Sequence, residues 1–177
     1  MMRLKPENIS HAGYAAVMGL LFAAASALNM LESLFSAFLP AGIRIGLSNI
    51  VIMAAILSLN LPSALVLVLL KAVLVLLTRG VTAGAMSLCG SLAAFAVTAL
   101  LFRKTKASYV LISVMGAFSH SLGQLLAAWG ILGTAAVFAY APILAIASTA
   151  TGICTGIVLK AVFPLLRSRV FDIKNRN

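Results

Sequence analysis

The chain has 177 residues, of which 63% are hydrophobic and only 9% are charged. A soluble protein needs more polar residues than this to cover its surface, so we expect an all-α integral membrane protein in the cell membrane, surrounded by membrane lipid. The net charge of +10 does not indicate nucleic-acid binding, because the basic residues lie mostly at the ends of apolar segments and few aromatic residues accompany them.

Apolar stretches of about 20 residues, each long enough to cross a bilayer as a helix, predict six membrane spans in one domain over residues 11–164. The expected spans cover approximately residues 11–29, 43–59, 62–78, 83–102, 108–132 and 143–164. Residues 30–42 are expected to form an outer loop or a short interfacial segment. Residues 1–10 are expected to be a cytoplasmic leader, and residues 165–177 a basic cytoplasmic tail.

The basic residues predict the orientation of these spans. They gather before the first span, in the loop 103–106 and in the tail after Pro164. Cytoplasmic loops carry an excess of lysine and arginine, so we expect both termini and the loop 103–106 on the inner side. Glu32, Arg44 and Arg79 then lie at the outer side.

The first span carries small residues at a strict four-residue spacing, namely Ala15, Gly19, Ala23 and Ala27. Such a ridge allows a second helix to approach closely in lipid. Two interpretations remain open from the residues alone. The ridge packs inside this bundle, or it docks to a separate membrane subunit.

The stretch Pro40–Val51 places an arginine at the mouth of an apolar helix, which is costly unless the charge is used. We interpret it as one wall of a binding site for a small anionic molecule. Arg44 and Ser48 share a helix face and are the candidates for ligand contact. Asn49 is included as a binding candidate, although it points away from Arg44 and is a candidate brace to a neighbouring helix.

Lys71 lies near the middle of the third span, where an ionisable residue marks a functional site by default. Its side chain either faces a polar cavity or is paired within the bundle. Arg79, in the outer turn after this span, is a third cationic position for an anionic ligand. On the fifth span, His120 and Gln124 belong to a small and polar stripe, and His120 is either a ligand contact or a hydrogen-bonded core residue. The pocket is expected between the second, third and fifth spans, with His120, Gln124 and Ser48 orienting the ligand by hydrogen bonds.

Catalytic residues are scarce. The chain has three acidic residues, Glu7, Glu32 and Asp172. Polyprenyl diphosphate synthases hold magnesium ions with several aspartates, and this chain cannot supply them. The sequence also has no nucleotide-binding loop and no metal-ligand spacing. We expect no enzyme activity, no cofactor and no metal.

Three stretches carry a resemblance to a known family: Arg44–Val51 (Arg-Ile-Gly-Leu-Ser-Asn-Ile-Val), Lys71 through Leu77–Gly80 (Leu-Thr-Arg-Gly), and Ala117–Leu126 (Ala-Phe-Ser-His-Ser-Leu-Gly-Gln-Leu-Leu). The chain resembles the Gx transporter family, widely labelled heptaprenyl diphosphate synthase component I, over nearly its whole length. That family is grouped with the S components of energy-coupling factor (ECF) transporters. Those are six-helix membrane proteins that bind vitamins or related small molecules.

The resemblance implies a substrate-binding transport subunit. It implies that Ala15, Gly19, Ala23 and Ala27 dock to a transmembrane coupling subunit driven by two ATPase subunits. It also implies a flavin, a quinone precursor or an isoprenoid precursor as the small-molecule ligand. Arg44 stands where relatives often have lysine, and Lys71 where a basic residue, often arginine, is expected. The alternative is a non-catalytic membrane subunit associated with heptaprenyl diphosphate synthesis.

Overall fold

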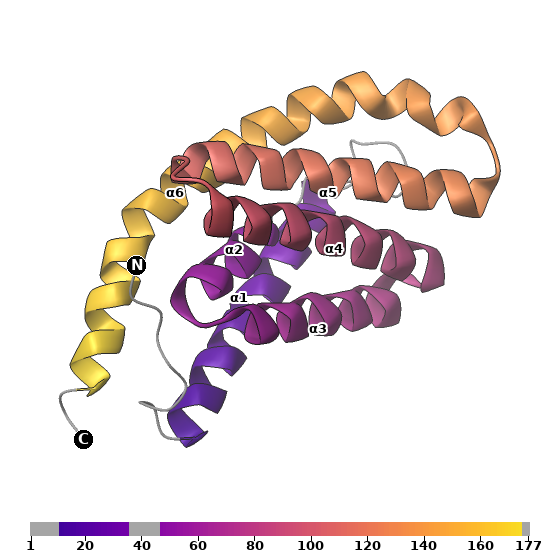
Figure 1. The fold of residues 1–177 in the computed structure, drawn as a ribbon. Coiled ribbons are helices and arrows are strands. Elements are labelled where there is room, and N and C mark those ends of the chain that lie inside the picture. Colours follow the sequence, from indigo (N-terminus) through magenta and orange to yellow (C-terminus); the bar gives the residue numbers. More distant parts are fainter. Residues whose placement is uncertain (1–10, 36–46, 175–177) are drawn as a thin grey trace.

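The structure is a computed structural model that describes residues 11–35 and 47–174. All of its regular structure within these ranges is helical (Figure 1). The helices are α1 (His11–Phe35), α2 (Asn49–Ser58), α3 (Leu61–Arg79), α4 (Val81–Lys104), α5 (Tyr109–Leu132), the 3₁₀ helix η3 (Ala135–Tyr140) and α6 (Ala141–Lys174). The chain is therefore an all-α protein, as predicted.

Five helical segments are long and apolar enough to cross a membrane: Ala12–Leu34, Leu61–Arg79, Val81–Lys104, Tyr109–Leu132 and Ala135–Ala161. These lengths and compositions are those of a multi-pass membrane protein. Helix α2 differs, because its 10 residues extend only about 15 Å. The second predicted span, residues 43–59, is thus helical only from Asn49 within the described chain.

Local signals in the sequence fix most of the helix ends. Asn60 accepts a hydrogen bond from the Ser63 backbone N–H at 2.8 Å and caps α3, with Pro62 in its first turn. Ser108 caps α5 in the same way. Gly80 alone joins α3 to α4, at a positive φ of 88° that favours glycine.

Two boundaries differ from the prediction. Helix α1 continues beyond Asn29 to Phe35, and in this last part Glu32 is buried while Leu31 and Leu34 are exposed. Residues 30–35 of the expected outer loop are therefore helical, and its remainder from 36 onward lies outside the described residues. Helix α6 continues through Pro164 to Lys174, so most of the expected tail is helical. The leucine, arginine and lysine residues after Pro164 are good helix formers.

Consecutive helices pack side by side from α3 to α6, while α1 packs on α2 and α3. The hydroxyl of Tyr14 bonds to Ser63 near the starts of α1 and α3. Near their other ends, Arg79 Nη2 donates to the Asn29 carbonyl at 3.4 Å. Helices α1 and α3 therefore run in the same direction. The chain between them must return to the end of the bundle where α1 began.

Helix α2 lies at the centre of the bundle and contacts α1, α3, α4, α5 and α6. Its residues 51–57 are all buried, so no face of this helix is left for lipid. The surrounding helices approach closely at glycines. A Cβ atom added at Gly123 of α5 would lie 2.8 Å from the Cys89 carbonyl oxygen of α4, and one at Gly152 of α6 would lie 2.5 Å from Val114 Cα of α5. The small residues of these helices therefore serve packing.

Candidate functional site

Lys71 is buried in the middle of α3, with 2% of its surface exposed. Its Nζ donates hydrogen bonds of 3.1 Å to Asn49 Oδ1 on α2 and of 3.1 Å to Ser91 Oγ on α4. The Lys71 side chain thus joins three helices at mid-depth of the bundle. The sequence left open whether Lys71 faces a polar cavity or is paired within the bundle, and these contacts show that it is paired within the bundle. The nearest cavity lies on the other side of Asn49.

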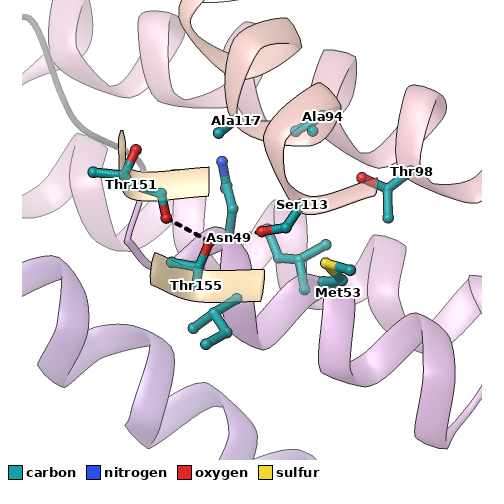
Figure 2. Close-up of a pocket in the computed structure, with 11 residues that line it drawn as sticks. Asn49, Met53, Ala94, Thr98, Ser113, Ala117, Thr151 and Thr155 are labelled. Carbon is teal, nitrogen blue, oxygen red and sulfur yellow. Dashed lines mark hydrogen bonds between the residues drawn. The ribbon is translucent and has the colours of Figure 1, made fainter. Parts of the chain in front are cut away.

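Asn49 links Lys71 to this cavity. Its side-chain oxygen accepts from Lys71, which confirms that Asn49 braces a neighbouring helix. Its side-chain nitrogen is buried and has no hydrogen-bond partner among the described residues. Figure 2 shows this nitrogen pointing toward Ala117 of α5, on the side of the amide that lines the cavity.

The cavity lies between α2, α4, α5 and α6, and we call it the hydroxyl cavity (Figure 2). Its volume is about 20 Å³, which is room for one or two water molecules. Four of its lining residues carry hydroxyl groups: Thr98, Ser113, Thr151 and Thr155. The remaining lining residues are Asn49, Ile50, Ile52, Met53, Ala94, Gly116 and Ala117.

The hydroxyl groups on α5 and α6 form a connected network. Thr151 Oγ1 donates to the Ala147 carbonyl at 2.8 Å, and Thr155 Oγ1 donates to the Thr151 carbonyl at 2.8 Å. Ser113 Oγ lies 2.7 Å from Thr155 Oγ1. Either of these two hydroxyls can be the donor in this hydrogen bond.

Two further buried hydroxyls lie close to this region in the sequence. Ser48 precedes α2, is fully buried and does not cap the helix, and its Oγ has no partner among the described residues. Ser87, one turn before Ser91 on α4, is likewise buried with its Oγ unsatisfied in the described chain. Buried hydroxyls without partners are uncommon, so both are candidates for contact with a bound molecule.

His120 and Gln124 lie together on the buried face of α5, as the stripe predicted. Gln124 Nε2 lies 2.8 Å from His120 Nε2, and both side chains are 1% exposed. An added Cβ at Gly90 of α4 would lie 2.8 Å from the His120 ring. Gly90 adjoins Ser91, so His120 and Lys71 contact the same turn of α4. Neither His120 nor Gln124 lines the hydroxyl cavity.

Of the remaining cationic candidates, the structure describes Arg79 and places it away from this site. The Arg79 side chain reaches Asn29 of α1, and Arg79 is eight residues beyond Lys71, or about 12 Å along α3. Arg44 lies outside the described residues. The structure thus brings Asn49 and Lys71 into contact, with Ser48 next to Asn49 in the chain, and leaves Arg79 at the end of the bundle.

The small-residue ridge of α1 faces outward. Ala15, Gly19, Ala23 and Ala27 are all exposed, and an added Cβ at Gly19 would meet no atom within 4 Å. The ridge therefore does not pack against the described part of the bundle, which removes the first of the two interpretations. Docking to another subunit stays a prediction.

Sequence reasoning missed the other lining residues of the site. The sequence did not single out Ser91 and Thr98 on α4, Ser113 on α5, or Thr151 and Thr155 on α6. A signal existed, because Thr151 and Thr155 are four residues apart and share a helix face. Among residues 11–35 and 47–174 there is no group of three or more His, Cys, Asp or Glu residues that could hold a metal ion.

Comparison with known proteins gives one match. A family model described as heptaprenyl diphosphate synthase component I matches residues 21–162. The matched range includes α2 to α5, most of α1 and the part of α6 that lines the hydroxyl cavity. No curated protein and no solved structure matches the chain.

Proposed function

Because the chain belongs to the heptaprenyl diphosphate synthase component I family, we propose that it is a non-catalytic membrane subunit that binds a small anionic molecule and works with partner subunits. The role is that of an S component in an ECF transporter. The ligand is a flavin, a quinone precursor or an isoprenoid precursor. No catalytic role is assigned to the subunit itself.

The observation that carries this proposal is the position of Lys71. An ammonium group at mid-depth of a membrane protein is costly and in general marks a substrate pathway or binding site. Here it lies beside the first turn of a short central helix, with the hydroxyl cavity on the other side of Asn49. In transporters, short or interrupted helices near the midplane commonly form substrate sites, and their starts favour anionic groups.

The proposed topology has six crossings with both termini inside. The parallel course of α1 and α3 supports it, because the chain between them has to cross back. Helices α4 and α6 then end, and α5 begins, at the end of the bundle where α1 starts. The loop containing Arg103, Lys104 and Lys106 is at this end, which is the inner side by the distribution of basic residues.

The proposed partners are a transmembrane coupling subunit and two ATPase subunits. The exposed ridge of α1 supports a helix-to-helix contact with the coupling subunit, since small residues permit close approach in lipid. The second candidate function is a membrane scaffold for heptaprenyl diphosphate synthesis, which the family description favours. It requires a soluble synthase that copurifies with the chain and does not require ATPases.

The test compares Lys71→Met with Lys160→Met in protein purified into lipid nanodiscs. Both changes remove one lysine, but Lys160 is exposed and lies at the end of the apolar segment Ala135–Ala161. Binding of riboflavin phosphate, an anionic quinone precursor and a prenyl phosphate is measured by equilibrium dialysis. We expect Lys71→Met to weaken binding of one of them at least tenfold, with no effect of Lys160→Met. Unchanged binding of every compound by Lys71→Met would contradict the proposal.

Mass spectrometry of molecules and proteins that copurify in mild detergent separates the two candidate functions. A coupling subunit with ATPases supports the transport role. A copurifying soluble synthase that carries aspartate-rich motifs supports the scaffold function instead.

A further inference from the structure

Two polar groups that line the hydroxyl cavity have no hydrogen-bond partner among the described residues. One is Asn49 Nδ2, which is buried and points toward Ala117 (Figure 2). The other is the hydroxyl of Thr98, a residue that is only 5% exposed. Buried polar groups in folded proteins are nearly always paired, so both groups require a partner inside the cavity.

Thr98 differs in this respect from other threonines of the helices. Four of them each donate the hydroxyl proton to the backbone carbonyl oxygen four residues earlier, at 2.8 Å, namely Thr78, Thr149, Thr151 and Thr155. Thr98 forms no such bond within the described part of α4. Its Oγ1 lies at the contact with α5, where a Cβ added at Gly116 would come within 2.7 Å of it. Both the proton and the lone pairs of this hydroxyl are therefore available to the cavity.

Ser113 of α5 supplies a third group at the cavity. Its Oγ lies 2.7 Å from Thr155 Oγ1, and either hydroxyl can be the donor. If Ser113 donates, its oxygen retains lone pairs for a bound group, and if Thr155 donates, Ser113 retains its proton. The cavity thus offers one fixed donor on α2 and two hydroxyls, on α4 and α5, that can act as donor or acceptor.

Lys71 determines which end of the Asn49 amide enters the cavity. Lys71 Nζ donates to Asn49 Oδ1 at 3.1 Å, and a reversed amide would place Nδ2 beside this donor instead of an acceptor. Asn49 Nδ2 is therefore held at the cavity, where it requires an acceptor atom, because a buried donor that stays unpaired is unfavourable.

The size and the donors of the cavity restrict what can occupy it. Its volume of about 20 Å³ is room for one or two water molecules and excludes an organic group. The N–H group of Asn49 would repel a metal cation. A buried anion would require several donors, and only Asn49 Nδ2 is a fixed donor here. Water fits, because it accepts from the amide and also pairs with hydroxyls of either sense.

We infer that the hydroxyl cavity binds one or two ordered water molecules that join Asn49 of α2 to Thr98 of α4 and Ser113 of α5. The water accepts a hydrogen bond from Asn49 Nδ2 and pairs with the two hydroxyls. It completes the hydrogen bonding of the amide whose oxygen holds Lys71, and it links the first turn of α2 to two neighbouring helices. The water is thus a structural part of the Lys71 site. This inference does not depend on the proposed function or on the identity of a ligand.

A crystal structure of the full chain, grown in a lipidic mesophase with bromide in place of chloride, tests the inference. We expect ordered density within hydrogen-bond distance of Asn49 Nδ2, without the anomalous signal of bromide. In Thr98→Val, a change that nearly preserves shape, this density should be lost. Thr82→Val is the matched control, because Thr82 is exposed on the same helix, and it should retain the density. An empty cavity, an anomalous peak in the cavity, or equally ordered density in Thr98→Val would each overturn the inference.

Thermal unfolding gives a second measurement in detergent solution. Asn49→Leu and Thr98→Val each remove one end of the water bridge, and no direct hydrogen bond joins the two side chains. The double variant should therefore lose less in melting temperature than the sum of the two single losses, because the water is lost only once. Asn49→Leu combined with Thr82→Val should give additive losses. Additive losses for Asn49→Leu with Thr98→Val would contradict the bridge.

Discussion

Asn49 accepts a hydrogen bond of 3.1 Å from Lys71, and this bond fixes the first turn of α2 to the middle of α3. The same amide faces the hydroxyl cavity with its nitrogen. One side chain therefore connects the buried Lys71 to the hydroxyl cavity. A change at Asn49 alters both the packing of Lys71 and the contacts open to a ligand.

Substitution of Asn49 should separate these two effects on stability. Asn49→Leu removes an acceptor from a buried ammonium group and should lower the free energy of unfolding by about 1–3 kcal/mol. Asn49→Asp retains the acceptor, so its loss should be smaller. Thermal unfolding in detergent, followed by circular dichroism, measures both. An equal loss in the two variants would mean that the contact with Lys71 does not stabilise the bundle.

Gly123→Ala should destabilise the contact between α4 and α5. The added Cβ would lie 2.8 Å from the Cys89 carbonyl oxygen and 3.0 Å from Gly90 Cα, and backbone atoms cannot rotate away as a side chain does. We expect a loss of about 1–3 kcal/mol by the same measurement. Gly130→Ala is the control on the same helix, because its Cβ would meet no atom within 4 Å. The prediction is wrong if the two variants unfold alike.

Gly19→Leu should interfere with a partner and leave the fold intact. The ridge of α1 is exposed and Gly19 has no neighbour within 4 Å, so the larger side chain creates no clash inside the bundle. We expect unchanged unfolding and unchanged ligand binding, with at least a tenfold loss of the coupling subunit on copurification. Leu77→Trp on the exposed face of α3 is the control for a bulky side chain elsewhere. Full retention of the coupling subunit by Gly19→Leu would contradict docking through this ridge.

The hydroxyl pair between α5 and α6 should contribute a small, measurable coupling. Ser113 and Thr155 are hydrogen-bonded at 2.7 Å, and such bonds between membrane helices average about 0.6 kcal/mol in double-mutant cycles. The cycle of Ser113→Ala, Thr155→Val and the double variant measures this energy. Additive losses would indicate that the two hydroxyls act independently.

Composition and apolar length were sufficient to predict an all-helical membrane protein and the bounds of α3 and α5 within a few residues. These bounds depend on local signals such as Asn60, Pro62 and Ser108, which act within one turn of the chain. The ends of α1 and α6 were not predicted. Each depends on whether polar residues beside an apolar stretch continue the helix, and the hydropathy pattern alone does not show this for Glu32 or for the residues after Pro164.

The site was predicted in part. The sequence singled out Lys71 because of its depth, and Asn49 as a brace, and the structure joins the two. The sequence did not indicate that Ser91 is the second acceptor for the Lys71 side chain. A serine on a membrane helix is equally typical of a small residue at a helix-packing face. The sequence also did not indicate Thr151 and Thr155 of α6. Their hydroxyls bond to carbonyl oxygens of their own helix, so only the packing of α2, α4, α5 and α6 shows that they line a cavity.

The central position of α2 also has a consequence for biosynthesis. The ribosome delivers α2 early, yet its buried residues 51–57 pack against helices made later, and its first turn lies at a cavity walled by Thr151 and Thr155 of α6. Helix α2 therefore reaches its final environment only when the last helix has entered the membrane. A nascent chain halted before α6 would present an unfinished core to the quality-control proteases of the membrane.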